Sequence, residues 1–151
     1  QICLGFNYRM TDIHAALGIS QMQRLDEFVT KRHFIAREYN QILSDLPLAI
    51  PHQHKDSYSS FHLYVISLKL HEINKTHKEV YEALRAVGIQ VNLHYIPIYR
   101  MPYYEQMGFN QGYCPQAEKY HSETLSIPMY PGLKESDLSF VVSSLSSILL
   151  S

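Results

Sequence analysis

The 151-residue sequence has no tryptophan, only two cysteines and almost no net charge, formally −1. Two cysteines that lie 111 positions apart, Cys3 and Cys114, cannot form the disulfide framework of a small secreted domain. We expect both to be free thiols in a reducing compartment, the cytoplasm. Because lysine and arginine are few and dispersed, the sequence also lacks the basic surface that a nucleic-acid partner would require.

Glycine is scarce as well, and the six glycines are spread along the chain, so neither a Walker loop nor a dinucleotide-binding loop is present. The longest apolar stretch, "LSFVVSSLSSILL", is short and interrupted by serines. A stretch of this length cannot span a bilayer, and we find no signal-peptide pattern. We therefore expect no membrane association. The sequence does not begin with methionine, and we expect it to be the later part of a longer protein.

Hydrophobic residues make up 46% of the sequence and charged residues 18%, which is typical of one globular domain. Apolar residues at steps of three and four predict helices, and runs of β-branched and aromatic residues predict strands. The expected helices cover residues 12–23, 25–46, 77–87, a segment beginning at 115, and 135–149. The expected strands cover residues 61–70, 89–95 and 125–130.

Local signals fix several of these boundaries. Thr76 and Glu79 form the ends of a capping box, and Gly88 stands where a left-handed helix cap belongs. The strand at 61–70 is apolar on both faces, which favours a sheet that is covered, or nearly covered, on both sides. The order of elements predicts an α+β fold in which a short sheet of about three strands has helices packed on it.

The spacing of histidines and cysteines bears on two kinds of chemistry, metal binding and catalysis by a Cys-His nucleophile. Nine histidines, among them His52, His54, His71 and His77, do not form any short-spaced ligand set, so we expect no metal site. Cys114 precedes Pro115 near a helix start, where a thiol can be activated, and His94 or His121 could serve as its base. No motif supplies a third orienting group. A small residue before a helix is the ordinary interpretation, and we predict no catalytic residue in this chain.

Two segments are harder to explain by packing alone. Asn7, Tyr8 and Arg9 precede the first helix, where an amide and a guanidinium can hold a phosphate or carboxylate. In the second segment, residues 92–104, a strand runs through His94 and Tyr95 into a tyrosine-rich loop. Residues that contact ligands are concentrated at such strand exits. The alternative is a loop that only packs on its own strand.

These segments resemble the pyridoxal-phosphate-dependent nucleotide-sugar aminotransferases of the DegT/StrS type. "GFNYRMTDIHAALGISQMQRLDEFVTKRHFIAREYNQIL" is similar to the family's Gly-x-Asn-x-Arg-Met segment and the helices after it. "VNLHYIPIYRMPYY" and "CPQAEKYHSETLSIPMYPGL" resemble two later family segments, and together the three cover essentially the whole chain. "GFNYRMTDI" and "HYIPIY" look closest to the transaminases that make UDP-4-amino-4,6-dideoxy sugars for pseudaminic acid.

The resemblance implies the C-terminal part of a fold-type-I aminotransferase, a homodimer that uses pyridoxal phosphate, glutamate and a UDP-linked sugar. It implies that residues 1–24 are an interface loop and helix of the large-domain and dimer region, and that 25–151 form the C-terminal small domain. Asn7 would bind the cofactor phosphate of the neighbouring subunit. Tyr8, Arg9, His94 and Tyr95 would contact the substrate. The family's Ser-x-x-x-Lys segment, which holds the cofactor, is absent from this sequence.

These observations lead to two hypotheses for the function of the chain. The first is the C-terminal portion of a sugar aminotransferase, inactive alone and not expected to hold cofactor because the lysine is missing. The second is a non-catalytic α+β interaction module that retains the fold. The coding sequence upstream of Gln1 discriminates between them, because only the enzyme requires a Ser-x-x-x-Lys segment there.

Overall fold

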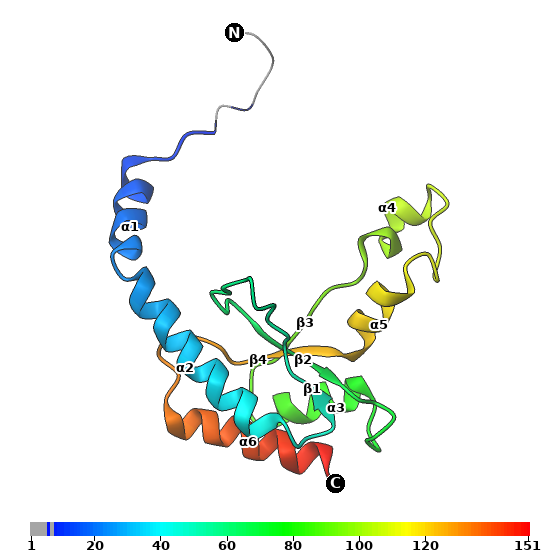
Figure 1. Cartoon of the computed structure of the whole chain (residues 1–151). Helices are drawn as coiled ribbons and strands as arrows, with labels where there is room; N and C mark the ends of the chain where they lie inside the picture. The colour runs from blue at the N-terminus through cyan, green and yellow to red at the C-terminus, as the bar shows by residue number, and fades with distance from the viewer. Residues whose placement is uncertain (1–5, 7) are drawn as a thin grey trace.

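The computed structural model describes residue 6 and residues 8–151. The chain contains, in order, α1 (Asp12–Met22), α2 (Leu25–Leu43), β1 (Leu48–Ala49), β2 (Tyr64–Leu68), α3 (His77–Ala86), β3 (Asn92–Leu93), the short 3-10 helix η1 (Ile98–Arg100), α4 (Pro102–Glu105), α5 (Pro115–Glu123), β4 (Thr124–Ile127) and α6 (Glu135–Leu149) (Figure 1). The five helices and three strands expected from the sequence are all present, in the expected order.

The sheet has four strands in the order β1-β2-β4-β3, and every neighbouring pair is antiparallel. The α+β class is confirmed. The sheet has one strand more than the expected number of about three. The additional strand, β1, has two residues that pair with the end of β2, Leu48 opposite Leu68. Pro47 and Pro51 flank it, and the sequence therefore predicted only the end of a helix here. Strands β2 and β3 are also shorter than predicted.

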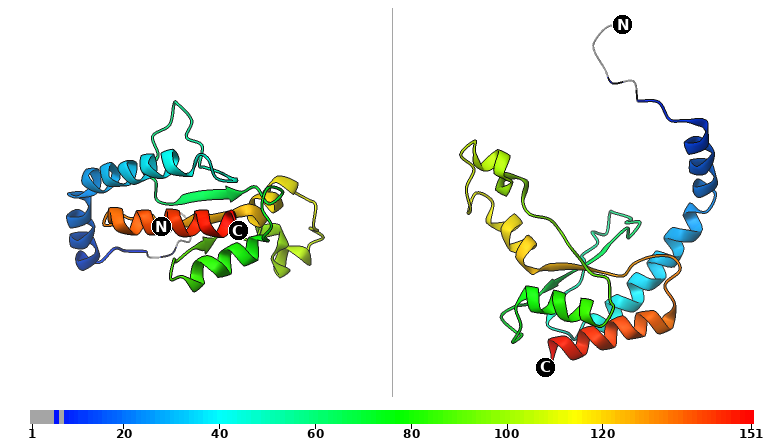
Figure 2. Two further views of the ribbon diagram at one scale, coloured as in Figure 1. Left: turned by 90° about the horizontal axis from the view of Figure 1, so that it is seen from below. Right: turned by 180° about the vertical axis from the view of Figure 1, so that it is seen from behind.

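The hydrophobic core lies between one face of the sheet and helices α2, α3 and α6 (Figures 1 and 2). Tyr64 and Ile66 of β2 stand opposite Ile127 and Leu125 of β4, and all four side chains are buried on this face. The alternate residues of β2 are only half-buried. The second face is thus less covered than the apolar character of residues 61–70 suggested.

Helix α2 contributes to the core through its C-terminal half. Its buried residues are Ile35, Ala36, Tyr39 and Leu43. The predicted apolar stripe began earlier, at Leu25, which is 43% exposed, and it also included Ile42, which is 44% exposed. In the first turns of α2, Phe28 and Val29 are half-buried, so this half of the helix is less well packed than the C-terminal half.

Helix α3 has the caps that its sequence predicted. The Glu79 carboxylate accepts a hydrogen bond from the Thr76 amide at 2.7 Å, and the Thr76 hydroxyl accepts one from the Glu79 amide at 3.2 Å. Gly88 follows the helix with φ of 86°. This left-handed conformation costs a residue with a Cβ atom free energy, which explains the glycine.

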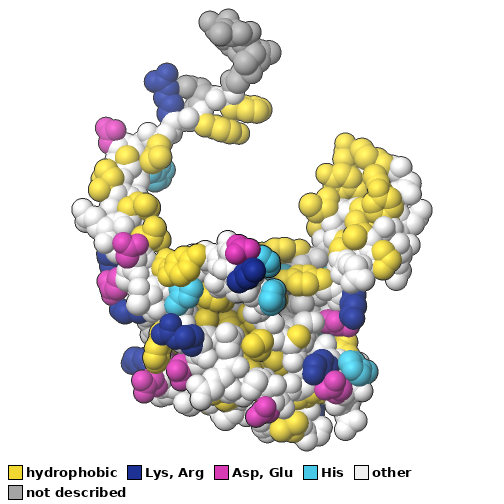
Figure 3. All heavy atoms as spheres, viewed as in Figure 1, with side chains coloured by type: hydrophobic (Ala, Val, Ile, Leu, Met, Phe, Trp, Pro, Cys, Tyr) yellow, Lys and Arg dark blue, Asp and Glu magenta, His cyan; other side chains and the backbone are white. Residues whose placement is uncertain are grey.

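Two projections rise from the opposite side of the sheet (Figure 1). One is α1, none of whose residues is buried. The other, which we call the aromatic arm, is residues 95–123 and carries η1, α4 and α5. Figure 3 shows the surface hollowed between them, with hydrophobic side chains gathered on the arm. In the part of the chain that the structure describes, no helix has the length and hydropathy needed to cross a membrane.

We expect Leu43→Ala to lower the free energy of unfolding by about 2–5 kcal/mol, because it empties a fully buried site. Ile42→Ala is the matched control one position earlier, and its half-exposed side chain should contribute less than about 1 kcal/mol. Urea unfolding of both variants measures the difference. Equal losses would contradict the packing of α2 described above.

Candidate functional site

The sheet face that points away from the core is lined with polar side chains. Ser67 of β2 stands opposite Thr124 of β4, and Asn92 of β3 stands opposite Ser126. His94 lies two residues beyond Asn92, so its side chain belongs to the same face. The Thr124 hydroxyl, which bonds the Tyr120 carbonyl at 2.7 Å, also lies 3.4 Å from the carbonyl oxygen of His94, which places the two residues level. This face of the sheet is therefore polar, and His94, Thr124 and Ser126 on it are buried.

His94 is the most unusual residue of this polar face. Its side chain is only 6% exposed, and neither ring nitrogen has a hydrogen-bond partner among the described residues. Burial lowers the pKa of His94 below its ordinary value, so the ring is neutral near pH 7. A buried polar group without a partner costs free energy. Such a group calls for an explanation, and contact with something outside this chain is one.

Four residues were predicted to contact substrate. The structure places His94 and Tyr95 together, whereas Tyr8 and Arg9 belong to a different segment. The Tyr95 ring lies edge-on to the His94 ring, with 5.0 Å between centroids, and is 75% exposed toward solvent. Tyr8 and Arg9 precede α1, on the opposite side of the hollow, and Tyr8 is 89% exposed. Asn7 lies outside the described residues. Within one copy of the chain, the segment before α1 therefore lies apart from the end of β3 (Figures 1 and 2).

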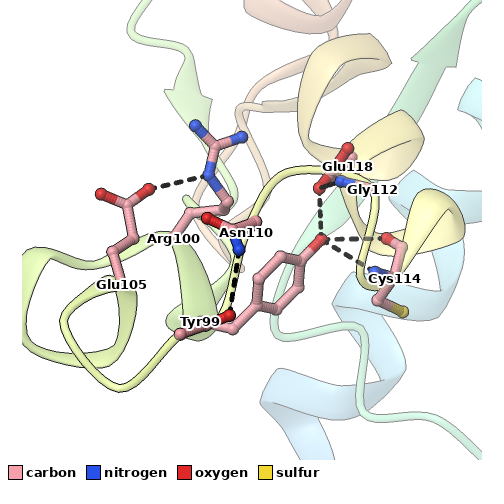
Figure 4. Close-up of polar contacts among 8 residues, drawn as sticks. Tyr99, Arg100, Glu105, Asn110, Gly112, Cys114 and Glu118 are labelled. Carbon is pink, nitrogen blue, oxygen red and sulfur yellow. Dashed lines mark hydrogen bonds and ion pairs between the residues drawn. The ribbon is translucent and has the colours of Figure 1, made fainter.

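The aromatic arm is held together by Tyr99 and Glu118 (Figure 4). The Tyr99 hydroxyl donates to Glu118 Oε1 at 2.7 Å and accepts from the Cys114 amide at 3.3 Å. Glu118 Oε1 also accepts from the Gly112 amide at 2.7 Å. The Tyr99 hydroxyl and then the Gly112 amide hold the pKa of Glu118 below its ordinary value. This network joins the segment after β3 to the start of α5.

Sequence reasoning did not find the Tyr99–Glu118 contact. The two residues are 19 positions apart and lie in two different family segments, and neither segment indicated that they pair. One signal was available in the sequence. Glu118 lies in the first turn of a helix that begins at Pro115, and a carboxylate there can accept hydrogen bonds from backbone amides of the preceding loop.

Cys114 is the N-cap residue of α5 and is exposed. It contributes to the arm through its backbone, and its sulfur has no hydrogen bond to His94 or His121 among the described residues. The hypothesis of a Cys-His nucleophile therefore gains no support from the geometry.

The histidines weighed as metal ligands lie apart from one another. His54 and His71 each contact a neighbouring acidic residue, at 3.5 Å and 3.4 Å, and His77 Nε2 bonds the carbonyl of Thr124 at 2.9 Å. Among residues 6 and 8–151, no three histidine, cysteine or acidic side chains are arranged to hold a metal ion.

With the geometry established, comparison with known proteins decides the family. Residues 1–146 match the DegT/DnrJ/EryC1/StrS aminotransferase family. The chain belongs to this family. It is 33% identical over 147 residues to the spore coat polysaccharide biosynthesis protein SpsC of Bacillus subtilis, covering 95% of this chain and 38% of SpsC. It is 35% identical over 147 residues to the UDP-4-amino-4,6-dideoxy-N-acetyl-beta-L-altrosamine transaminase of Campylobacter jejuni, covering 97% of this chain and 39% of that protein.

Solved structures agree with the sequence relatives. Helicobacter pylori PseC, an aminotransferase involved in the biosynthesis of pseudoaminic acid, superposes with a TM-score of 0.88 at 29% identity, covering 98% of this chain and 40% of PseC. DesV of S. venezuelae superposes with a TM-score of 0.87 at 26% identity, covering 97% of this chain and 38% of DesV. The predicted aminotransferase small-domain fold is confirmed. The chain spans about two fifths of the length of these relatives.

The resemblance implies that a lysine in a Ser-x-x-x-Lys segment holds the cofactor. The seven lysines of this chain lie in other contexts. Lys31 pairs with Glu27, Lys69 with Glu72 and Lys78 with Glu82, while Lys75 bonds Ser151. Lys55, Lys119 and Lys134 are exposed. No step of the reaction is therefore assigned to a lysine of this chain.

We expect His94→Phe to raise the free energy of unfolding by about 1 kcal/mol at pH 6, because it removes ring nitrogens that are buried without partners. The stability of the unmodified chain should fall as pH drops through about 6.5, since the unfolded chain then binds a proton that the buried ring disfavours. Urea unfolding between pH 5 and 8 measures both effects.

His71→Phe is the control for this experiment, because His71 is 80% exposed. It should leave the pH dependence in place, whereas His94→Phe should reduce it. If His94→Phe destabilises the chain at every pH, the ring has hydrogen-bond partners in solution, and the polar face is fully satisfied.

Proposed function

We propose that this chain is the C-terminal portion of a pyridoxal-phosphate-dependent aminotransferase that moves an amino group from glutamate to a 4-keto nucleotide sugar. The match of residues 1–146 to the aminotransferase family is the observation that carries the proposal. When bound, the cofactor takes up the amino group from the donor and passes it to the keto sugar. This chain supplies binding surface to that reaction.

The relatives support the class of substrate. The C. jejuni protein is a transaminase of a UDP-linked dideoxy sugar, and the H. pylori enzyme is involved in the biosynthesis of pseudoaminic acid. The segment between β3 and α4 supplies side chains suited to such a ligand. His94 offers an unused donor and acceptor, and Tyr95 offers an exposed ring beside it. We assign these two residues to the sugar-nucleotide end of the pocket.

The first 24 residues belong, in this proposal, to the large-domain and dimer region of the whole enzyme. Helix α1 has no buried residue, although Ile13, Leu17 and Met22 are apolar and 59–81% exposed. Apolar side chains of this number on one short helix favour coverage by another part of the assembly. Asn7 would then bind the cofactor of the neighbouring subunit, with Tyr8 and Arg9 at its substrate. A cytoplasmic homodimer completes the proposal.

We expect the 151-residue chain to show no transamination of a keto nucleotide sugar, and no cofactor adduct that borohydride can trap. The physical reason is that no lysine of this chain stands in the family's cofactor-holding context. The longer gene product, with a Ser-x-x-x-Lys segment upstream, should show both. Absorbance spectroscopy and a glutamate-dependent turnover assay make the comparison. Turnover by the 151-residue chain would contradict the proposal that the cofactor-holding lysine lies outside it. An upstream sequence without that lysine would favour the interaction module.

In the whole enzyme, Asn7→Ala should weaken cofactor retention by about 1.5–3 kcal/mol, the scale of one hydrogen bond to a charged group. Arg9→Lys is the second variant: if Arg9 holds an anion through two parallel hydrogen bonds, a lysine does not replace it. Cofactor dissociation from dimers at matched protein concentration is the measurement. Unchanged dissociation in Asn7→Ala would leave this loop as a structural entry to α1.

A further inference from the structure

The aromatic arm, residues 95–123, has no hydrophobic core of its own. None of its residues is buried, and its backbone hydrogen bonds among the described residues join positions at most four apart. The arm consists of an outgoing limb, residues 95–101, a tip, residues 102–111, and a returning limb, residues 112–123, which leads to β4. Contacts between side chains therefore decide how the two limbs lie against each other.

Tyr99 and Glu118 make polar contacts between the limbs (Figure 4). The Tyr99 hydroxyl lies 2.7 Å from Glu118 Oε1, and it also lies 3.1 Å from the carbonyl oxygen of Cys114 and 3.3 Å from its amide nitrogen. Glu118 Oε1 accepts from the Gly112 amide as well, at 2.7 Å. The ring of Tyr99 packs on the ring of Tyr113, with 5.4 Å between centroids. Hydrogen bonds to an ionised carboxylate are about twice as strong as those between neutral groups. We call the contact between Tyr99 and Glu118 the clasp.

The clasp is connected to Tyr95 by a stiff stretch of backbone. Pro97 lies midway between Tyr95 and Tyr99, with φ of −52° and ψ of 133°. A proline fixes its own φ and keeps the residue before it extended, so this stretch has few conformations. At its base, the His94 carbonyl lies 3.4 Å from the Thr124 hydroxyl of β4. A displacement of Tyr99 is therefore passed on to Tyr95, while the base of the arm stays with the sheet.

We propose that Glu118 is a positioning residue: through Tyr99 it holds the outgoing limb, and with it Tyr95, in the orientation that the substrate requires. This inference rests on the proposed function, which assigns Tyr95 to the sugar-nucleotide end of the pocket. Without the clasp, the limb samples other orientations. The apparent affinity for the sugar nucleotide then falls in proportion to the fraction of chains in the competent one. The glutamate half of the reaction uses no residue of the arm in this proposal and is unaffected.

Hydrogen exchange of the 151-residue chain, resolved by NMR, tests whether the clasp holds the arm. Tyr99→Phe keeps the ring and removes the hydroxyl. We expect the amides of residues 98–117 to exchange about tenfold faster, the scale of one hydrogen bond to a charged group, and residues 61–70 to be unchanged. Glu105→Gln is the matched control, because the Glu105 carboxylate bonds Arg100 at 3.0 Å without reaching the returning limb. It should change exchange by less than about twofold.

Kinetics of the whole enzyme test whether the clasp positions the substrate segment. Tyr99→Phe and Glu118→Ala should raise the KM for the keto nucleotide sugar about tenfold, in line with the exchange result. The rate at which glutamate loads its amino group should stay within about twofold. Glu118→Gln keeps an oxygen that can accept both hydrogen bonds, so it should raise KM less than Glu118→Ala. Glu105→Gln should leave both steps unchanged.

Unchanged exchange in Tyr99→Phe overturns the proposal, and so does faster exchange with an unchanged KM. An equal loss in the glutamate step also overturns it, because the clasp would then be a general support of the fold. If Glu118→Ala does not fold, the comparison of Tyr99→Phe with Glu105→Gln carries the test.

A different result would overturn the proposed function alone. If the whole unmodified enzyme shows no turnover, the transaminase proposal fails, and calorimetric titration with UDP then decides the role of the clasp. Weaker binding by Tyr99→Phe than by Glu105→Gln supports the positioning role, and equal binding overturns it.

Discussion

The arrangement of the sheet against α2 depends on one guanidinium. Arg32 Nη1 lies within 2.8–3.0 Å of three carbonyl oxygens, those of Phe61, His62 and Met129. Phe61 and His62 lead into β2, and Met129 leaves β4, so one side chain fixes the helix to the same end of both central strands. Phe61 has φ of 46°, a left-handed conformation that costs a bulky residue free energy. Burial lowers the pKa of Arg32, yet arginine stays charged in proteins. A neutral side chain of similar shape could not satisfy three carbonyls.

The two faces of the sheet differ in how they are covered. Beyond Arg32, the Tyr39 hydroxyl donates to the Pro128 carbonyl at 3.0 Å, and the Tyr64 hydroxyl donates to Asn40 at 2.6 Å. Polar contacts thus surround the core, which lets aromatic side chains be fully buried with their hydroxyls paired. Among the described residues, no such helix layer covers the opposite face, where the ring nitrogens of His94 have no hydrogen-bond partner. The free energy lost at His94 is small beside the burial of the core, so the fold tolerates it.

The sequence predicted what depends on neighbours along the chain. The helix caps at Thr76 and Gly88, the apolar period of α2 and the strand in residues 61–70 all reflect local constraints, and each was found. What it could not predict depends on residues far apart in the chain. The pairing of Arg32 with carbonyls up to 97 positions away is one such case, and the two-residue strand β1 is another. Site prediction had the same limit. The strand exit and the family resemblance identified His94 as a candidate, but only the sheet register showed which face it occupies.

The same division separates a buried core of this chain from its margins. The buried side chains of α2, α3, α6 and the sheet form one continuous cluster that requires nothing from α1 or from the tip of the aromatic arm. The residues proposed to meet ligands, in contrast, lie at the margins of that cluster, before α1 and at the end of β3. Marginal positions cost little stability when they change, because few core contacts depend on them. A core that does not depend on the margins is therefore a physical basis on which related proteins can retain one fold at 26–35% identity.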